Sequence, residues 1–255
     1  MSPSKPSPDD EFYVHYGALS PSYRRFLARF IPLLLFGAIA FAVVLPYVHD
    51  QYNAGGIRGT VELEGLLVAD PVPHLIVPRA GDTSNKIPFS RYVLSGTGKT
   101  SVKPEIAEQV GNWVHLNGIM VSRNQLSVIA ARSAETIEPP ANISITPDRG
   151  NSLGTYDLQG EILDGKCYPG VMKPGQSKTH RACAIRCISG GVPAVFRVQN
   201  SRDDVMYFLL ADAEGKAVKD GIIDLVADPV RIQGEVIQYD DMFVIQADPA
   251  TYERI

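Results

Sequence analysis

Nineteen consecutive residues, Phe30–Val48, contain no charged side chain. At about 1.5 Å per residue, a helix of this length just crosses the hydrocarbon core of a bilayer, which is about 30 Å thick. A cleaved signal peptide has a shorter apolar region and a small-residue cleavage site, which this stretch lacks. The remaining alternative is a buried helix of a soluble domain. We favour one uncleaved transmembrane anchor, residues 26–48.

The charges on either side of this stretch predict its orientation. Arg24, Arg25 and Arg29 precede it, whereas the twenty residues after it contain one base, Arg58. Basic flanks stay on the cytoplasmic side of a membrane. We therefore expect a cytoplasmic tail, residues 1–25, and a C-terminal part outside the cytoplasm. This is the topology of a single-pass protein of the bacterial inner membrane with periplasmic domains.

Charge and motifs exclude several function classes. The 255 residues include 24 Lys and Arg against 28 Asp and Glu, a formal net charge of -4. Binding to nucleic acid needs clustered bases, so we expect no nucleic-acid partner. The segment Gly96–Thr100 (GTGKT) resembles half a phosphate-binding loop, but Val93 stands where the first glycine belongs. We interpret it as a hairpin turn and expect no nucleotide. No catalytic residues can be assigned, so enzymatic activity is left open and is not favoured.

After the apolar stretch, the sequence changes to short segments with alternating apolar and polar residues. Gln125–Ile129, Leu158–Leu163 and Met242–Ile245 are examples, and Gly, Asn and Asp separate such segments. Many short strands are typical of a barrel or a sandwich. We expect a mainly β fold: one N-terminal transmembrane helix followed by two tandem small OB-like β-barrels, residues 56–138 and 154–255.

An internal repeat supports two barrels. From a tyrosine to a glycine the spacing is 26 residues in one copy and 27 in the other, and from that glycine to an isoleucine it is eleven in both. The matched positions are Tyr92, Gly118 and Ile129 in the first copy and Tyr207, Gly234 and Ile245 in the second. Upstream, Gly59-Thr-Val-Glu is matched to Gly160-Glu-Ile-Leu. Between the tyrosine and the glycine, we expect a helix or turn that closes each barrel.

All three cysteines lie in an insertion of the second copy, residues 167–191. If its second half is helical, His180, Cys183 and Cys187 fall at i, i+3 and i+7 on one face. Cys167 can return from the strand end as a fourth ligand. Three thiolates and one imidazole form a closed tetrahedral set, which is typical of structural Zn(II) or of another thiolate-bound metal.

Two other interpretations of the cysteines stay open. In an oxidising compartment, Cys167 pairs with Cys183 or Cys187 and leaves one thiol. Alternatively, the three cysteines are small buried side chains. The chain has no Cys-x-x-Cys-His motif, so we expect no covalently attached haem.

The segment Gly160–Cys167, continued by His180-x-x-Cys183-Ala-x-x-Cys187-Ile-x-Gly-Gly, resembles exported, membrane-anchored bacterial OB-like barrel proteins of unassigned function. The resemblance covers residues 156–250 and implies a small barrel with a metal or redox site. The architecture is also similar to the haem chaperone of cytochrome c maturation, which has a single span and a periplasmic OB barrel. That family attaches haem through a His-x-x-x-Tyr motif, which this sequence lacks.

These features predict a membrane-anchored periplasmic accessory or assembly subunit of a membrane complex, for example a respiratory one, with a Cys3His metal site. Its expected partners are the membrane and other subunits of that complex. The alternative is a periplasmic thiol-redox protein, or one that delivers metal or haem. Tightly held zinc favours the first hypothesis, whereas labile copper or reactive thiols favour the second.

Overall fold

The computed structural model describes residues 19–50, 55–79, 88–141, 143, 145 and 150–255. Most of the expected cytoplasmic tail, residues 1–18, lies outside this set. The chain divides into two compact units. One contains the N-terminal helix, and the other, Tyr52–Ile255, contains the strands.

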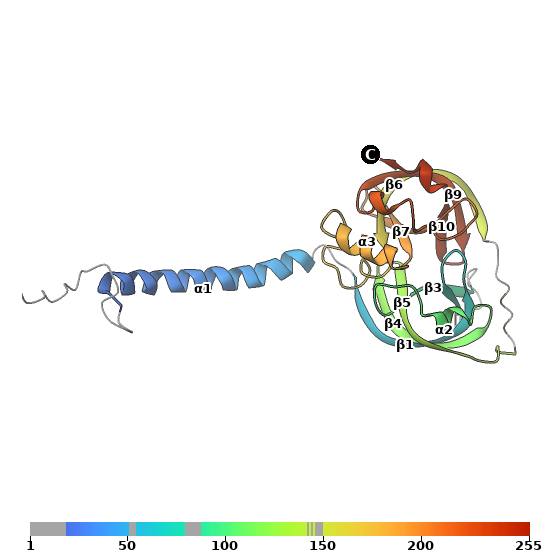
Figure 1. Cartoon of the computed structure of the whole chain (residues 1–255), viewed down its shortest axis with the longest axis horizontal. Coiled ribbons are helices and arrows are strands. Elements are labelled where there is room, and N and C mark those ends of the chain that lie inside the picture. Colours follow the sequence, from blue (N-terminus) through green and yellow to red (C-terminus); the bar gives the residue numbers. More distant parts are fainter. Residues whose placement is uncertain (1–18, 51–54, 80–87, 142, 144, 146–149) are drawn as a thin grey trace, which may run out of the picture. The chain divides into compact units, whose positions relative to one another are not determined.

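The N-terminal helix, α1, comprises Pro21–Asp50 (Figure 1). Its segment Pro21–Val48 has a mean hydropathy of 2.4 over its most apolar window, and the protein buries no part of that window. The described part of the chain therefore contains one helix that is long and apolar enough to span a membrane. The helix includes the whole of the expected anchor, residues 26–48.

Five strands of the first barrel close in the order β1-β2-β3-β5-β4. They are β1 (Gly56–Val68), β2 (His74–Pro78), β3 (Phe89–Ser95), β4 (Trp113–Arg123) and β5 (Leu126–Thr136). The β3–β5 pair is parallel, and the other pairs are antiparallel. Between β3 and β4 lies the short helix α2 (Pro104–Ala107), which confirms the expected helix at this place.

The second barrel repeats this topology. Its strands are β6 (Asn151–Asp164), β7 (Ala194–Gln199), β8 (Val205–Ala211), β9 (Pro229–Tyr239) and β10 (Met242–Gln246). They follow the order β10-β8-β7-β6-β9, and a β9–β10 pairing closes the barrel. Here β8 and β10 are the parallel pair. The remaining elements are α3 (Arg181–Ser189), η1 (Ile223–Leu225), η2 (Pro249–Thr251) and β11 (Glu253–Arg254). The fold is thus mainly β with two tandem OB-like barrels, as expected.

The strand registers correct two details of the repeat. Gly65 pairs with β4 at the repeat position where Gly160 pairs with β9. Gly160 therefore corresponds to Gly65, and the match of Gly59 to Gly160 is wrong. Gly59 corresponds instead to Gly154. Each of these two glycines lies at a β-bulge, with φ of 113° and 102°, a conformation that glycine adopts without the cost of a Cβ.

The tyrosine match is also displaced by one residue. In the parallel strand pair of each barrel, Leu94 and Leu210 lie opposite the isoleucine that ends the repeat, Ile129 in the first copy and Ile245 in the second. Phe208, rather than Tyr207, therefore corresponds to Tyr92. This shift accounts for the one-residue difference in spacing, because Phe208 is 26 residues before its glycine, as Tyr92 is.

Apolar side chains fill each barrel and also connect the two. One cluster lies within the second barrel and another within the first. A further cluster contains residues of both barrels, among them Val93, Val121 and Val128 with Leu163, Val195, Leu209 and Val244. Residues 52–255 accordingly form one compact unit. Whether 56–138 and 154–255 fold independently stays a prediction.

Candidate thiol and metal site

Three cysteines from two segments of the second barrel converge. Cys167 lies in the turn that follows β6, and α3 carries Cys183 and Cys187 one turn apart. The three Sγ atoms all lie within 4.8 Å of one another. Cys187 is buried, the other two are partly exposed, and all three are free thiols. The structure thus brings together three of the four residues for which the sequence predicted a metal site.

Helix α3 explains why two of these cysteines meet. Residues four apart lie on the same face of a helix, so Cys183 and Cys187 project together. The helix ends at Gly190, and Gly191 adopts a φ of 94°, a left-handed conformation that suits glycine. The expected helix in the second half of the insertion is therefore confirmed.

His180 does not join the three sulfurs. It is the N-cap residue of α3, and its Nε2 lies 2.6 Å from Oδ2 of Asp164, with both side chains fully buried. Neither ring nitrogen belongs to the group of ligand atoms within 4.8 Å. Nδ1 is buried and has no hydrogen-bond partner among the residues that the structure describes.

The Asp164 carboxylate contacts both the start of the insertion and the N-cap of α3. Its Oδ1 accepts the backbone N–H of Lys166 at 3.0 Å and that of Cys167 at 2.5 Å, while its Oδ2 faces His180. A carboxylate removed from water needs such partners. Asp164 therefore fixes the turn of Cys167 relative to the start of α3, a role that sequence reasoning missed.

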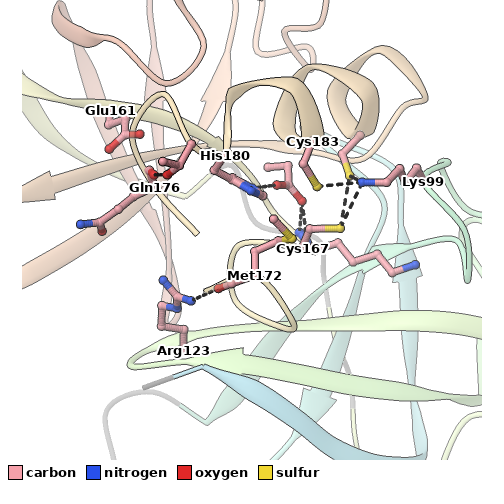
Figure 2. Close-up of polar contacts among 12 residues, drawn as sticks. Lys99, Arg123, Glu161, Cys167, Met172, Gln176, His180 and Cys183 are labelled. Atoms are coloured by element: carbon pink, nitrogen blue, oxygen red, sulfur yellow. Dashed lines mark hydrogen bonds and ion pairs between the residues drawn. The ribbon is translucent and has the colours of Figure 1, made fainter. Parts of the chain in front are cut away.

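A lysine of the first barrel completes the cluster. Lys99 lies between β3 and α2, and its Nζ is 2.8 Å from Sγ of Cys183, 3.5 Å from that of Cys187 and 3.6 Å from that of Cys167. Figure 2 shows the lysine directed at Cys167 and Cys183, with His180 turned to a carboxylate. No pattern in the sequence indicates this contact, because 68 residues separate Lys99 from the nearest cysteine.

The segment Gly96–Thr100 is a turn, but it leads from β3 to α2 and is not the expected hairpin turn. Contacts from the second barrel hold it in place. Gly96 N–H donates to the Thr100 carbonyl at 2.9 Å. The ammonium group of Lys166, the residue before Cys167, donates hydrogen bonds to the Gly96 and Gly98 carbonyls. The backbone of Lys99 is therefore held against the insertion that carries the cysteines.

The thiols differ in acidity. Cys187 donates a hydrogen bond to Cys167 at 3.5 Å, and this bond lowers the pKa of Cys167 to about 6. The charge of Lys99 also lowers this pKa, whereas burial raises it. The same hydrogen bond, together with burial, raises the pKa of Cys187. Burial also raises the pKa of Cys183 although Lys99 donates to it. These contacts thus favour the thiolate at Cys167 over the other two thiols, and thiolates are the form that binds metals and attacks electrophiles.

Comparison with known proteins assigns no family. No protein-family model matches the chain, and no curated protein matches it. Among solved structures it is similar to a deletion mutant of the single-stranded DNA binding protein from Thermus aquaticus, with 12% sequence identity and a TM-score of 0.22 over 78% of this chain and 95% of that one. Of the resemblance drawn from the sequence, the structure supports the apolar N-terminal helix and the OB-like barrels.

Proposed function

We propose that this chain is a membrane-anchored metal–thiolate protein, in which Cys167, Cys183 and Cys187 hold Zn(II) or another thiolate-bound metal. The observation that carries the proposal is the convergence of their three sulfurs within 4.8 Å. In a tetrahedral site with Zn–S bonds of about 2.3 Å, two sulfurs are about 3.8 Å apart. The sulfurs are therefore spaced so that small side-chain movements bring them onto one ion.

His180 is the proposed fourth ligand, through Nδ1. A metal-binding histidine usually donates its second ring N–H to a carboxylate, which fixes the tautomer and the ring orientation. Asp164 provides that carboxylate at 2.6 Å from Nε2, and Nδ1 is buried without a partner among the described residues. Binding through Nδ1 requires the imidazole of His180 to move toward the sulfurs, because its nitrogens do not belong to the group of ligand atoms that lie within 4.8 Å of one another.

The apolar helix supports an anchored role. We propose that α1 crosses the bacterial inner membrane once, with the basic flank at Arg24, Arg25 and Arg29 on the cytoplasmic side and the barrels in the periplasm. A protein of this design, with a metal held for structure, suits an accessory or assembly subunit of a membrane complex. An alkaline phosphatase fused after Ile255 should be active, and a fluorescent reporter that matures only in the cytoplasm should stay dark.

Metal analysis of full-length protein, purified from membranes in detergent under reducing conditions, tests the site. We expect about one zinc or other thiophilic ion per chain, and none in the variant in which all three cysteines are replaced by serine. Equal metal content in the two proteins, or no metal in either, would sink the proposal. Cross-linking in intact membranes followed by mass spectrometry then identifies the subunits that lie beside the barrels.

A second candidate function is thiol–disulfide exchange or metal delivery to periplasmic partners. The lowered pKa of Cys167 and the 3.5 Å between its sulfur and that of Cys187 favour it. In this case Cys167 should react with a thiol-specific reagent faster than the other two at pH 7. Metal should then be weakly held, and the two sulfurs should form a reversible disulfide.

A further inference from the structure

Lys99 occupies the position toward which all three cysteine sulfurs converge. Its Nζ lies between 2.8 and 3.6 Å from each of them. A metal ion bound by the same three sulfurs would lie about 2.3 Å from each. An ammonium and a metal ion that both contact the same three sulfurs repel each other and compete for those sulfurs.

The backbone of Lys99 packs closely against the end of α3. A Cβ placed on Gly190, the C-cap of α3, would lie 1.9 Å from the carbonyl oxygen of Lys99. Two residues further along, Ser101 N–H donates to the carbonyl of Gly190 at 3.0 Å. The turn thus packs directly against the end of the helix that carries two of the cysteines, and we expect the side chain of Lys99, rather than its backbone, to move when the ammonium is displaced.

We propose that Lys99 is a built-in competitor of the metal: its ammonium occupies the cation position of the empty site, and metal binding displaces it. The inference rests on the proposed function and adds a control to the same site. When the site is empty, Lys99 lies beside the three sulfurs and offsets negative charge on Cys167. When metal binds, the ammonium moves into solvent, which is accessible because Cys167 and Cys183 are partly exposed.

The exchange weakens metal binding and couples it to a contact of the first barrel. Metal binding has to break the contacts of Lys99 with the sulfurs. The metal affinity of the site is therefore lower than the three cysteines would give without the lysine. Since Lys99 belongs to the first barrel and the cysteines to the second, occupancy of the site changes a contact between the barrels.

A zinc titration of full-length protein in detergent tests this, with a chromophoric chelator as the competing ligand. Lys99→Met keeps the aliphatic stem and removes the charge, so it should bind zinc about tenfold or more tightly than the wild type. Lys103→Met is the matched control, because Lys103 belongs to the same segment but its Nζ bonds the carbonyl of Arg132 at 3.3 Å. Its zinc affinity should equal that of the wild type.

The outcomes separate the two proposals. If the wild type binds zinc and Lys99→Met binds it equally or less tightly, Lys99 is no competitor, although the metal site stands. If neither the wild type nor either variant binds zinc, the metal site itself is wrong and the inference falls with it. A gain of tenfold or more that is restricted to Lys99→Met supports both.

Amine labelling gives a readout that does not depend on affinity. Mass spectrometry after treatment with an acylating reagent should show that zinc increases the modification of Lys99 while that of Lys103 is unchanged. Unchanged or reduced modification of Lys99 in zinc-saturated protein would overturn the displacement.

Discussion

Nε2 of His180 lies 2.6 Å from Oδ2 of Asp164, and both side chains are fully buried. The pair joins the end of β6, which the turn of Cys167 follows, to the N-cap of α3, the helix that carries the other two cysteines. With Nε2 donating to the carboxylate, the lone pair of Nδ1 is the one available to a metal. The pair therefore both orders the insertion and selects the imidazole tautomer.

Replacing Asp164 by Asn should weaken metal binding. The amide can still accept the backbone N–H groups of Lys166 and Cys167, but its NH2 then faces Nε2 and favours the tautomer with hydrogen on Nδ1. We expect zinc affinity to fall by about 10–100-fold, the usual cost of losing such a partner. Competition titration of the full-length protein measures it. Unchanged affinity would remove His180 from the ligand set.

Glu161→Gln is the matched control for this variant. The carboxylate of Glu161 accepts the N–H of Ser177 in the same insertion, and glutamine keeps an acceptor oxygen for that bond. Zinc affinity in Glu161→Gln should stay within about twofold of the wild type. A loss as large as in Asp164→Asn would mean that any disturbance of the insertion weakens the site.

Chelation should destabilise the second barrel, and reductant alone should not. The metal closes the loop between Cys167 and α3 and offsets the entropy of ordering it. A ligand present at a thousand times its Kd stabilises a fold by about 4 kcal/mol, which sets the scale of the loss on adding a chelator. Urea unfolding followed by circular dichroism measures this loss. Cys187→Ser should be less stable than the wild type and indifferent to chelator.

The disulfide interpretation makes the opposite prediction for the same experiment. Stability would then fall with reductant and would not respond to chelator. That result would place the thiol-redox function first.

Acid should destabilise the fold through His74. Nδ1 lies 2.9 Å from the Val72 carbonyl and Nε2 3.0 Å from NH1 of Arg91, so the neutral ring fits as donor and acceptor. Burial lowers the pKa of His74 to about 4, and the charge of Arg91 acts in the same direction. The unfolded chain protonates this histidine below about pH 6.5. Between pH 6.5 and 4 unfolding therefore takes up a proton, and stability falls as the pH falls.

The size of the effect follows from the two pKa values. The full contribution is present above pH 6.5, and its loss by pH 4 amounts to at most about 3 kcal/mol. Urea unfolding at several pH values measures it, with His74→Gln as the variant that cannot titrate. If the two proteins lose stability equally between pH 6.5 and 4, His74 does not carry the acid response.

A fragment of residues 154–255 should fold into the second barrel but be less stable than in the whole chain. Its five strands close without the first barrel, yet Val195, Leu209 and Val244 lose the partners that the first barrel supplies in the shared cluster. Cooperative urea unfolding of the fragment, with a lower midpoint, is the expected result. An aggregated or molten fragment would show that the two barrels need a common core.

The fold could be predicted because its signals are local or periodic. The uncharged stretch that forms α1 and the alternating segments that form the strands are visible without knowledge of tertiary contacts. The repeat was found although it was misaligned by one residue at Tyr207 and by several at Gly59. Sequence similarity over a few residues does not fix strand register, which depends on bulges such as the one at Gly154.

The site could be predicted only in part. Helical spacing explains the convergence of Cys183 and Cys187, but the same reasoning placed His180 on that face although it is the N-cap residue and turns to Asp164. Lys99 could not be found, because it reaches the cysteines through the packing of one barrel on the other. Contacts of this kind leave no periodicity in the sequence.

The most direct test of the central claim is X-ray absorption at the zinc edge of full-length protein loaded with zinc under reducing conditions. The proposal predicts three sulfur ligands at about 2.3 Å and one nitrogen at about 2.0–2.1 Å, with the outer-shell signal of an imidazole. A first shell of nitrogen and oxygen with fewer than three sulfurs would contradict a site formed by Cys167, Cys183 and Cys187.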